Sequence, residues 1–377
     1  MKQVVKRTVP EWKRLMRNSI RNGADVEGVD EATRAEIDEV SKEFPFFSNE
    51  YYTGLIQEKD DPIWKQIIPS IDELNDPNYY MSDALAEDGD DSPVKHLTHR
   101  YPDRVLFTVT YTCAIYCRFC TRKRKVGKYP IPPWREMEAV FDYLREHTEV
   151  RDVLLSGGDP FLLSDAYLEK ILANLKAIPH IELIRVGSKL PCVLPQRITP
   201  ELCDMLKKYH PFYVNTHFSH PRELTPEAEL ACNRLADAGI PLGNQTVLLK
   251  GVNDDAEILK ELFLGLLKFR VKPYYLYQAD LVKGTHKFRT DVATGLEIMK
   301  QLQGHITGFA VPTYVIDAPG GGGKMAVGPN RLVALDDDYA TLQNFEGKVF
   351  KYPAKGDASS SEDWPNATNG TIIQDYV

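Results

Sequence analysis

Apolar and polar positions follow two different patterns on either side of residue 96. Before it the chain is mostly polar, and its apolar residues recur at helical spacing. Trp12, Leu15 and Met16 share one helix face, and a second amphipathic segment runs from Glu31 to Phe44. We therefore expect residues 1–95 to form a helical N-terminal extension without strands.

From residue 96 on, short apolar runs alternate with longer amphipathic segments, which is typical of repeated βα units around a parallel sheet. The predicted strands are 105–110, 153–155, 183–186, 212–216, 246–249, 274–277 and 310–316. The predicted helices are 133–147, 165–177, 200–209, 226–239, 255–269 and 292–303. Six or so units are fewer than the eight of a closed (β/α)8 barrel. The pattern therefore predicts an α/β fold, an open partial (β/α)6 barrel over residues 96–330.

Residues 331–377 are left as a short C-terminal extension. Its last part, from Lys355 to Val377, is rich in Ser, Asp, Asn and Gly, and we expect it to be weakly ordered.

Composition narrows the possible functions. At 377 residues, with 43% hydrophobic residues, the chain can bury a large core. It contains no apolar run of the ~20 residues that a membrane span requires, and residues 1–10 do not resemble a signal peptide. We expect a cytoplasmic location. A net charge of -8 argues against a nucleic-acid partner, and six cysteines, three of them scattered, do not form a disulfide framework.

Three cysteines stand close together directly after the first predicted strand. Cys113, Cys117 and Cys120 have the spacing C-x3-C-x2-C. Three thiolates can hold three irons of a 4Fe-4S cluster, which leaves the fourth iron open for the amino and carboxylate groups of S-adenosylmethionine. The spacing resembles that of the radical S-adenosylmethionine family. A zinc site is the alternative, but it needs a fourth cysteine or histidine at paired spacing.

Other polar residues lie near predicted strand ends, where parallel βα folds place their chemistry. Gly157, Gly158 and Asp159 follow one strand, and the glycines let the backbone come close to a ligand, here the methionine amino group. His217 and Gln245 alone would more often be structural residues. The cysteine motif favours them as cofactor contacts, because it already predicts a cofactor at this rim.

Two further stretches could carry chemistry. The acidic run from Glu87 to Asp91 lacks the ligand spacing of a calcium loop, so we expect it to be a solvated linker. Four glycines at 320–323 end in Lys324, which is followed by Met325 instead of the Ser or Thr of a phosphate loop. A lysine held at the end of such a loop is suited to form a Schiff base with pyridoxal phosphate. The alternative is a flexible glycine linker with a solvated lysine.

Between Asp61 and Phe350 the sequence resembles the lysine 2,3-aminomutase family. The runs that carry the resemblance are Leu97–Arg104, Cys113–Arg122, Leu154–Asp159, Val193–Thr199, Asn215–Phe218, Gln278–Asp280 and Val315–Lys324. The resemblance implies a radical enzyme that needs a 4Fe-4S cluster, S-adenosylmethionine and pyridoxal phosphate. In such an enzyme a 5'-deoxyadenosyl radical removes a non-acidic hydrogen from the β-carbon of lysine, and the amino group then moves between adjacent carbons.

The resemblance also implies roles for single residues. The cluster ligands are Cys113, Cys117 and Cys120, and the contacts of S-adenosylmethionine include His217 and Gln245. Pyridoxal phosphate is carried by Lys324, with Arg104 and Arg100 nearby. Arg122 is expected to bind the carboxylate of the substrate, and Asp280 and Asp317 are expected to bind the distal ammonium of lysine. An external one-electron reductant of flavodoxin or ferredoxin type and a homo-oligomer are implied as well.

The sequence departs from the family at a structural zinc site that some members carry. Asp255 follows the Gly-Val-Asn-Asp run where those members have a cysteine, and the chain has no cysteine after Cys232. We therefore predict no zinc.

Other functions remain as alternatives. Glutamate as substrate is disfavoured, because its side-chain carboxylate would meet Asp280 and Asp317. Arginine remains open, because a guanidinium also pairs with carboxylates. A non-catalytic iron-sulfur electron carrier is disfavoured, because it needs neither an open iron nor a lysine such as Lys324.

Overall fold

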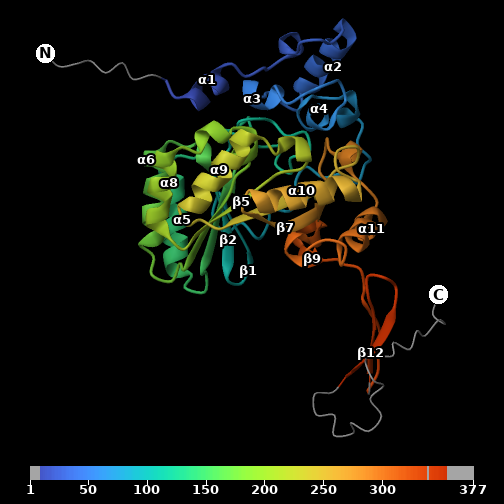
Figure 1. Cartoon of the computed structure of the whole chain (residues 1–377). Coiled ribbons are helices and arrows are strands. Elements are labelled where there is room, and N and C mark those ends of the chain that lie inside the picture. The colour runs from blue at the N-terminus through green and yellow to red at the C-terminus, as the bar shows by residue number, and fades with distance from the viewer. Residues whose placement is uncertain (1–8, 338, 355–377) are drawn as a thin grey trace, which may run out of the picture.

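The computed structural model describes residues 9–337 and 339–354. Its main element is a nine-stranded sheet whose strands follow one another in chain order (Figure 1). The strands are β1 (Leu97–Tyr101), β2 (Arg104–Thr110), β3 (Asp152–Gly157), β4 (Leu183–Gly187), β5 (Phe212–Thr216), β6 (Leu242–Leu248), β7 (Val271–Gln278), β8 (Thr313–Ala318) and β9 (Gly323–Ala326). Strands β2 to β8 pair in parallel, and β1 and β9 run antiparallel at the two edges. The carboxyl ends of the parallel strands therefore meet at one rim.

Helices connect the parallel strands and cover the outside of the sheet. They are α5 (Trp134–Glu146), α6 (Asp165–Lys176), α7 (Leu190–Val193), α8 (Pro200–Leu206), α9 (Pro226–Asp237), α10 (Ala256–Lys268) and α11 (Val292–Leu302). Four begin at a side chain that accepts a backbone N–H, namely Ser164, Thr199, Thr225 and Asp255. Such caps satisfy the free N–H groups of a first helical turn.

The two faces of the sheet differ in burial. Along β2, Val105, Phe107 and Val109 are fully buried, and the Phe107 ring packs edge-on against Phe141 of α5 with centroids 5.7 Å apart. Strands β3, β4 and β6 alternate buried with half-buried residues. Because successive side chains point to opposite faces, the half-buried positions line the concave inner side, where ligands can enter.

This arrangement confirms the predicted α/β partial barrel. The predicted strands and helices all occur, and six βα units precede β8. Three predicted strand starts were wrong, because β6 begins already at Leu242, β7 already at Val271 and β8 only at Thr313. The short edge strands β1 and β9 were not predicted.

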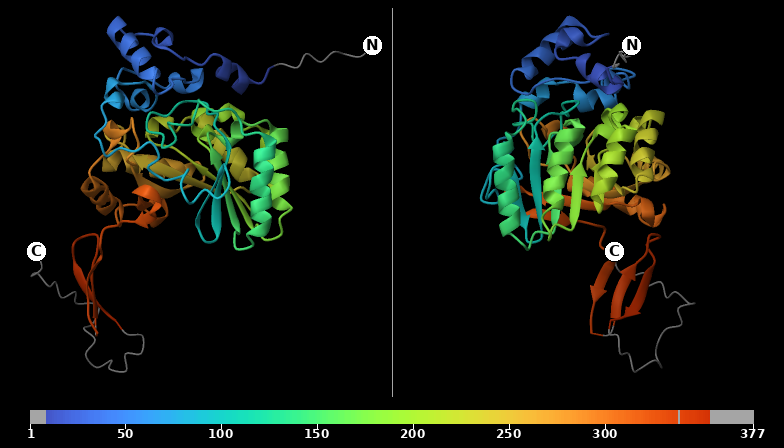
Figure 2. Two further views of the ribbon diagram at one scale, coloured as in Figure 1. Left: turned by 180° about the vertical axis from the view of Figure 1, so that it is seen from behind. Right: turned by 90° about the vertical axis from the view of Figure 1, so that its left-hand side faces the viewer.

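Most of the described N-terminal residues lie over one end of the barrel (Figures 1 and 2). The helices are α1 (Glu11–Arg17), α2 (Glu31–Ser41), α3 (Glu50–Thr53) and α4 (Pro62–Ile67). A backbone bridge joins Ser48 to Ile115 of the cysteine loop, and Asn49 donates a hydrogen bond to the Val193 carbonyl at 2.9 Å. This extension therefore covers the rim at which the strands end. No helix in the described part of the chain is long and apolar enough to span a bilayer.

A second, three-stranded antiparallel sheet follows the barrel and projects away from it (Figures 1 and 2). It consists of β10 (Leu332–Leu335), β11 (Tyr339–Gln343) and β12 (Val349–Pro353). Several of its large apolar side chains are exposed, among them Leu335 at 64% and Tyr352 at 62%. The predicted weakly ordered tail, 355–377, lies outside the described residues.

Candidate active site

The three clustered cysteines lie in the loop that follows β2. All three thiols are free and half-buried. Within residues 9–337 and 339–354, only His99, His147 and Glu149 bring three possible metal ligands within 4.8 Å of one another. The cysteine sulfurs are therefore too far apart for one shared ion, which fits ligands at separate irons of a cluster better than a zinc site. Burial raises the pKa of the Cys117 thiol to about 12, and a bound metal would reverse that effect.

Gly157 and Gly158 fix the beginning of the cysteine loop. A Cβ on Gly158 would lie 2.3 Å from the Thr112 carbonyl oxygen, and one on Gly157, which has a φ of +122°, would lie 2.1 Å from the Thr110 carbonyl oxygen. The Gly158 N–H also donates to the Thr110 carbonyl at 2.6 Å. In the described structure the two glycines therefore bring β3 against the cysteine loop. Their predicted contact with a methionine amino group stays a prediction.

Both carboxylate oxygens of Asp159 accept hydrogen bonds from other groups of the protein. One oxygen accepts a hydrogen bond from Ser188 Oγ at 2.8 Å, and the other accepts one from the Lys189 backbone N–H at 2.8 Å. Burial raises the pKa of Asp159 to about 6. The side chain thus ties the end of β3 to the residues after β4.

His217 lies against the cysteine loop, as its predicted role requires. Its ring stacks on Phe119 at 5.5 Å between centroids, and its Nε2 lies 3.1 Å from Ser219 Oγ. Gln245 lies in the middle of β6, so its predicted place at a strand end was wrong. The Gln245 side chain is half-buried and makes no hydrogen bond to another described residue.

Lys189 was not predicted from the sequence, yet it lies beside the cysteine loop. Its Nζ lies 5.3 Å from the Phe119 ring and 3.6 Å from Glu223 Oε1. After burial, its charge is the next cause that keeps the His217 pKa well below its ordinary value. Its position directly after a predicted strand was the available signal. Its ammonium is largely buried, pairs with Glu223 and lies close to the cysteine loop.

A buried ionic cluster fastens the cysteine loop to the N-terminal extension. Glu73 is 1% exposed, and its carboxylate meets Arg118 at 2.7 Å and Lys123 at 2.6 Å. Burial opposes its ionisation, but Arg118 and Lys123 outweigh burial and hold the Glu73 pKa at about 2. Arg118 follows Cys117 and Lys123 lies three residues after Cys120, so these ion pairs hold the cysteine loop against the N-terminal extension.

Lys324 lies on β9, at the end of a short turn. Gly320, Gly321 and Gly323 have φ angles of 70°, 88° and 82°, which glycine adopts at no steric cost. The glycine run is therefore a tight turn between β8 and β9. The Lys324 Nζ pairs with Asp317 Oδ2 at 2.6 Å, and the Lys324 backbone N–H donates to the Tyr101 hydroxyl at 2.9 Å.

Two arginines of the β1–β2 hairpin lie on the same side as Lys324. The Arg104 guanidinium lies over the Tyr101 ring at 3.9 Å. Arg100 pairs with Asp91 at 2.8 Å, and its Nη2 lies 3.4 Å from the place of a Cβ on Gly321. Two guanidinium groups, a tyrosine hydroxyl and a glycine turn next to a lysine form a donor set that fits a phosphate-bearing aldehyde.

Asp280 and Asp317 border one cavity, and their role in binding an ammonium stays a prediction. The cavity has a volume of about 70 Å³ and is also lined by Arg289. Asp317 Oδ1 is buried without a hydrogen-bond partner among the described residues. Burial, followed by the charge of Asp317, raises the pKa of Asp280 to about 7. Two carboxylates with an unused oxygen can accept a small cation.

Arg122 is already paired in this structure. Glu87 accepts hydrogen bonds from its Nε at 2.8 Å and its Nη2 at 2.5 Å, and both side chains are largely buried. Asp88 pairs with Arg124 at 2.9 Å, and Asp91 pairs with Arg100 as described above. The prediction of a solvated linker at 87–91 was therefore wrong for Glu87, whereas residues 88–90 are exposed as expected. The arginine partners of Glu87 and Asp88 lie far along the chain, so the local sequence pattern gave no sign of these pairs.

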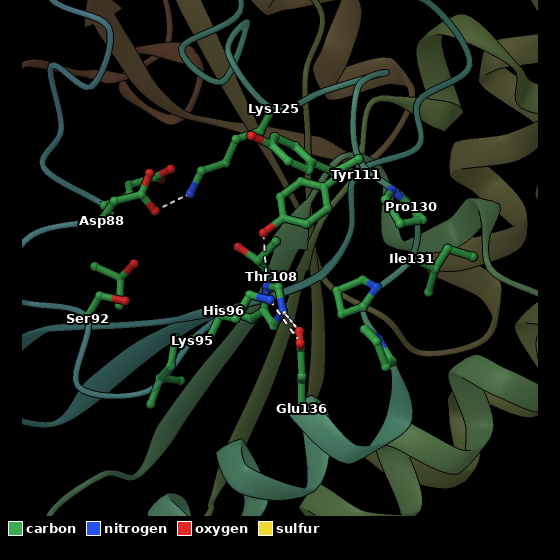
Figure 3. Close-up of a pocket in the computed structure, with 16 residues that line it drawn as sticks. Asp88, Ser92, Lys95, His96, Thr108, Tyr111, Lys125, Pro130, Ile131 and Glu136 are labelled. Atoms are coloured by element: carbon green, nitrogen blue, oxygen red, sulfur yellow. Dashed lines mark hydrogen bonds and ion pairs between the residues drawn. The ribbon is translucent and has the colours of Figure 1, made fainter.

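A larger cavity of about 450 Å³ is lined by residues before β1, after the cysteine loop and at the start of α5 (Figure 3). Within it, His96 Nδ1 lies 2.9 Å from the Tyr111 hydroxyl and His96 Nε2 lies 2.6 Å from Glu136. Of the predicted site residues, none lines this cavity. The donor sets around Cys117 and Lys324 therefore identify the candidate active site better than cavity size does.

Comparisons with known proteins agree with this geometry. A family model described as the radical SAM superfamily matches residues 107–262, and one described as lysine-2,3-aminomutase matches residues 299–375. The chain is 50% identical over 362 residues to an L-lysine 2,3-aminomutase of Methanococcus maripaludis, covering 93% of this chain and 83% of that protein.

Two other relatives are similar over most of their length. An L-lysine 2,3-aminomutase of Clostridium subterminale is 50% identical over 348 residues, covering 91% of this chain and 83% of that protein. A glutamate 2,3-aminomutase of Clostridioides difficile is 48% identical over 318 residues, covering 84% and 75%. The chain belongs to the lysine 2,3-aminomutase family of radical S-adenosylmethionine enzymes.

Proposed function

We propose that the protein is an L-lysine 2,3-aminomutase, an isomerase that interconverts L-lysine and L-β-lysine. The observation that carries this proposal is the pair Asp280 and Asp317 around a small cavity beside Lys324. A lysine substrate has a cationic end that needs such a pair when it leaves water. The relatives named as L-lysine 2,3-aminomutases support the same substrate.

We propose that Cys113, Cys117 and Cys120 hold a 4Fe-4S cluster at the rim of the barrel. His217 and Lys189 lie beside the cysteine loop and Gln245 lies further down, on β6; we propose that these three side chains contact S-adenosylmethionine, while Gly157 and Gly158 keep the loop in place. Bound there, the cluster and S-adenosylmethionine would supply the 5'-deoxyadenosyl radical that removes a hydrogen from the substrate. The buried surroundings exclude water from this step.

We propose that Lys324 carries pyridoxal phosphate, with Arg100, Arg104 and Tyr101 around the phosphate. That cofactor supplies a π system through which the amino group can migrate. A Lys324 bonded to the cofactor no longer carries the ammonium that now pairs with Asp317. Attachment of the cofactor would thus free Asp317 for the ammonium of the substrate.

We propose that Arg122 binds the carboxylate at the other end of the substrate, because a guanidinium can pair with a carboxylate through two parallel hydrogen bonds. Glutamate fits this site less well, since its second carboxylate would face Asp280 and Asp317. Arginine would meet the same two carboxylates with a larger cation. The cavity of about 70 Å³ favours an ammonium.

We further propose a homo-oligomer, a cytoplasmic location, and electron supply by a flavodoxin or ferredoxin type of protein. The projecting sheet β10–β12 supports the oligomer, because exposed apolar side chains on a separate sheet need a protein surface to cover them. We also propose domain boundaries near residues 95 and 330.

The decisive experiment is anaerobic incubation of the reconstituted protein with S-adenosylmethionine, pyridoxal phosphate, dithionite and one amino acid at a time. Lysine should give β-lysine, and arginine and glutamate should give at most traces of their β-amino acids. Faster conversion of arginine or glutamate than of lysine would overturn the proposed substrate. A Lys324→Ala variant serves as the control, because it should retain iron but form no product.

A further inference from the structure

Glu87 occupies the edge of Arg122 that a carboxylate ligand would use. Its two oxygens take the Nε and Nη2 hydrogens of Arg122. The remaining nitrogen, Nη1, donates to Ser156 Oγ at 2.9 Å and to the Gly157 carbonyl at 3.2 Å. A bidentate carboxylate needs two parallel N–H groups on one edge of the guanidinium. No free edge is left while Glu87 stays in place.

Both ends of the proposed substrate site are thus neutralised by the protein's own side chains. Lys324 pairs with Asp317, which is expected to bind the ammonium of the substrate. Glu87 pairs with Arg122, which is expected to bind the carboxylate of the substrate. Bonding to pyridoxal phosphate would remove the charge of Lys324. No such reaction removes Glu87, but another carboxylate can take its place on Arg122.

The chain around Glu87 is held independently of this pair. On one side, the Ala84 carbonyl accepts a hydrogen bond from the Gly320 N–H at 3.0 Å. On the other side, Asp88 pairs with Arg124 at 2.9 Å and also with Lys125. The Glu87 side chain can therefore leave Arg122 by rotating, while the backbone of the segment keeps its contacts.

We propose that Glu87 is a specificity-determining residue that exchanges places with the α-carboxylate of the substrate on Arg122. This inference rests on the proposed function and adds that Glu87 competes with the substrate carboxylate for Arg122. Arg122 stays neutralised when the site is empty, so the buried guanidinium never lacks an anion. Because the β-amino acid product keeps the same carboxylate, the return of Glu87 accompanies product release. Glu87 sets how tightly a carboxylate is held, and it has no such effect on an amine without one.

The test is a comparison of L-lysine with cadaverine, which has the same carbon chain and distal ammonium but no carboxylate. Binding is measured by isothermal titration calorimetry on the pyridoxal-phosphate-loaded, cluster-containing protein without S-adenosylmethionine, so that no turnover occurs. Glu87→Gln keeps the size of the side chain but removes its charge, and should tighten lysine binding about tenfold, equal to ~1.4 kcal/mol. Cadaverine binding should not tighten. Asp90→Asn, the matched control at an exposed residue of the same segment, should leave the affinity for both ligands unchanged.

Two results would overturn the inference. Weaker lysine binding by Glu87→Gln would show that Glu87 holds Arg122 ready for the substrate, and equal tightening for lysine and cadaverine would show a general charge effect. A folded Glu87→Asp variant, with its carboxylate drawn back by one methylene, should lie between the parent and Glu87→Gln. If no variant binds lysine while the parent binds another amino acid, the proposed substrate fails. The same variants measured with that amino acid then decide the role of Glu87.

Discussion

Among single residues, Gly158 leaves no room for a side chain. A Cβ at this position would lie 2.3 Å from a backbone oxygen of Thr112, which no side-chain rotation relieves. We expect Gly158→Ala to displace the cysteine loop and to lower the iron content of the reconstituted protein severely. Iron and sulfide analysis checks this. The control is Gly308→Ala, whose Cβ would meet no atom within 4 Å; equal iron loss in both variants would contradict the argument.

Asp280 should make lysine binding depend on pH. Its pKa of about 7 lies above the ordinary value because burial and Asp317 disfavour the charged form. An ammonium favours the ionised form, so below pH 7 binding must first release a proton, and the affinity should fall by up to about tenfold per pH unit. Above pH 7 the affinity should level off. Calorimetric titrations with lysine from pH 6 to 8.5 measure this, and Asp280→Asn should flatten the profile.

The two carboxylates should also matter for turnover. Asp280→Asn and Asp317→Asn should each lower kcat/KM for lysine by about a hundredfold, or ~2.7 kcal/mol. Cluster and pyridoxal contents should stay at the parental level. Near-parental β-lysine formation by both folded variants would refute the ammonium-binding role.

Residue types and spacing predicted the anchoring residues of the candidate site but not their partners. The cysteine loop, His217 and Lys324 could be selected from local motifs. The pair of Glu87 with Arg122 could not, because 34 residues separate them and only the fold brings them together. Gln245 was misplaced because the polar start of β6 hid the first residues of that strand.

At the level of elements, the link between the N-terminal extension and the cysteine loop depends on Glu73. Replacement by Gln would leave Arg118 and Lys123 buried without their anion, at a cost of ~3 to 5 kcal/mol. Because the Glu73 pKa is lowered to about 2, its contribution is complete above about pH 4.5 and is lost as the pH falls through 2. Chemical denaturation at pH 7 measures the loss. Glu39→Gln, which breaks an exposed pair with Lys42, should cost less than about 1 kcal/mol.

Apolar periodicity was sufficient to predict β2 to β8 and their helices, because each of these elements buries one face. It missed β1 and β9 for the opposite reason. Leu97–Tyr101 and Gly323–Ala326 are short and mostly exposed or half-buried. Strands of this kind are defined by backbone pairing to a neighbour, which leaves no trace in the hydrophobic pattern.

At the scale of the whole molecule, the projecting sheet should determine assembly. Leu335 and Tyr352 are both mostly exposed, and burying them against another copy would stabilise an oligomer. We expect Leu335→Glu combined with Tyr352→Glu to reduce the oligomer to a smaller species in sedimentation velocity experiments. Leu230→Glu on α9, where the leucine is 51% exposed, is the control and should leave the mass unchanged.

The contact of Lys324 with Tyr101 joins strands at opposite edges of the sheet. β1 and β9 are its first and last strands, and within the described residues no backbone ladder connects them. A cofactor bonded to Lys324 with its phosphate on Arg100 and Arg104 would therefore connect the two edge strands β1 and β9 and close the barrel. Removing it should speed amide hydrogen exchange in both strands while exchange in β4 and β5 stays slow. Pyridoxal phosphate would then stabilise the fold of the enzyme in addition to taking part in the reaction.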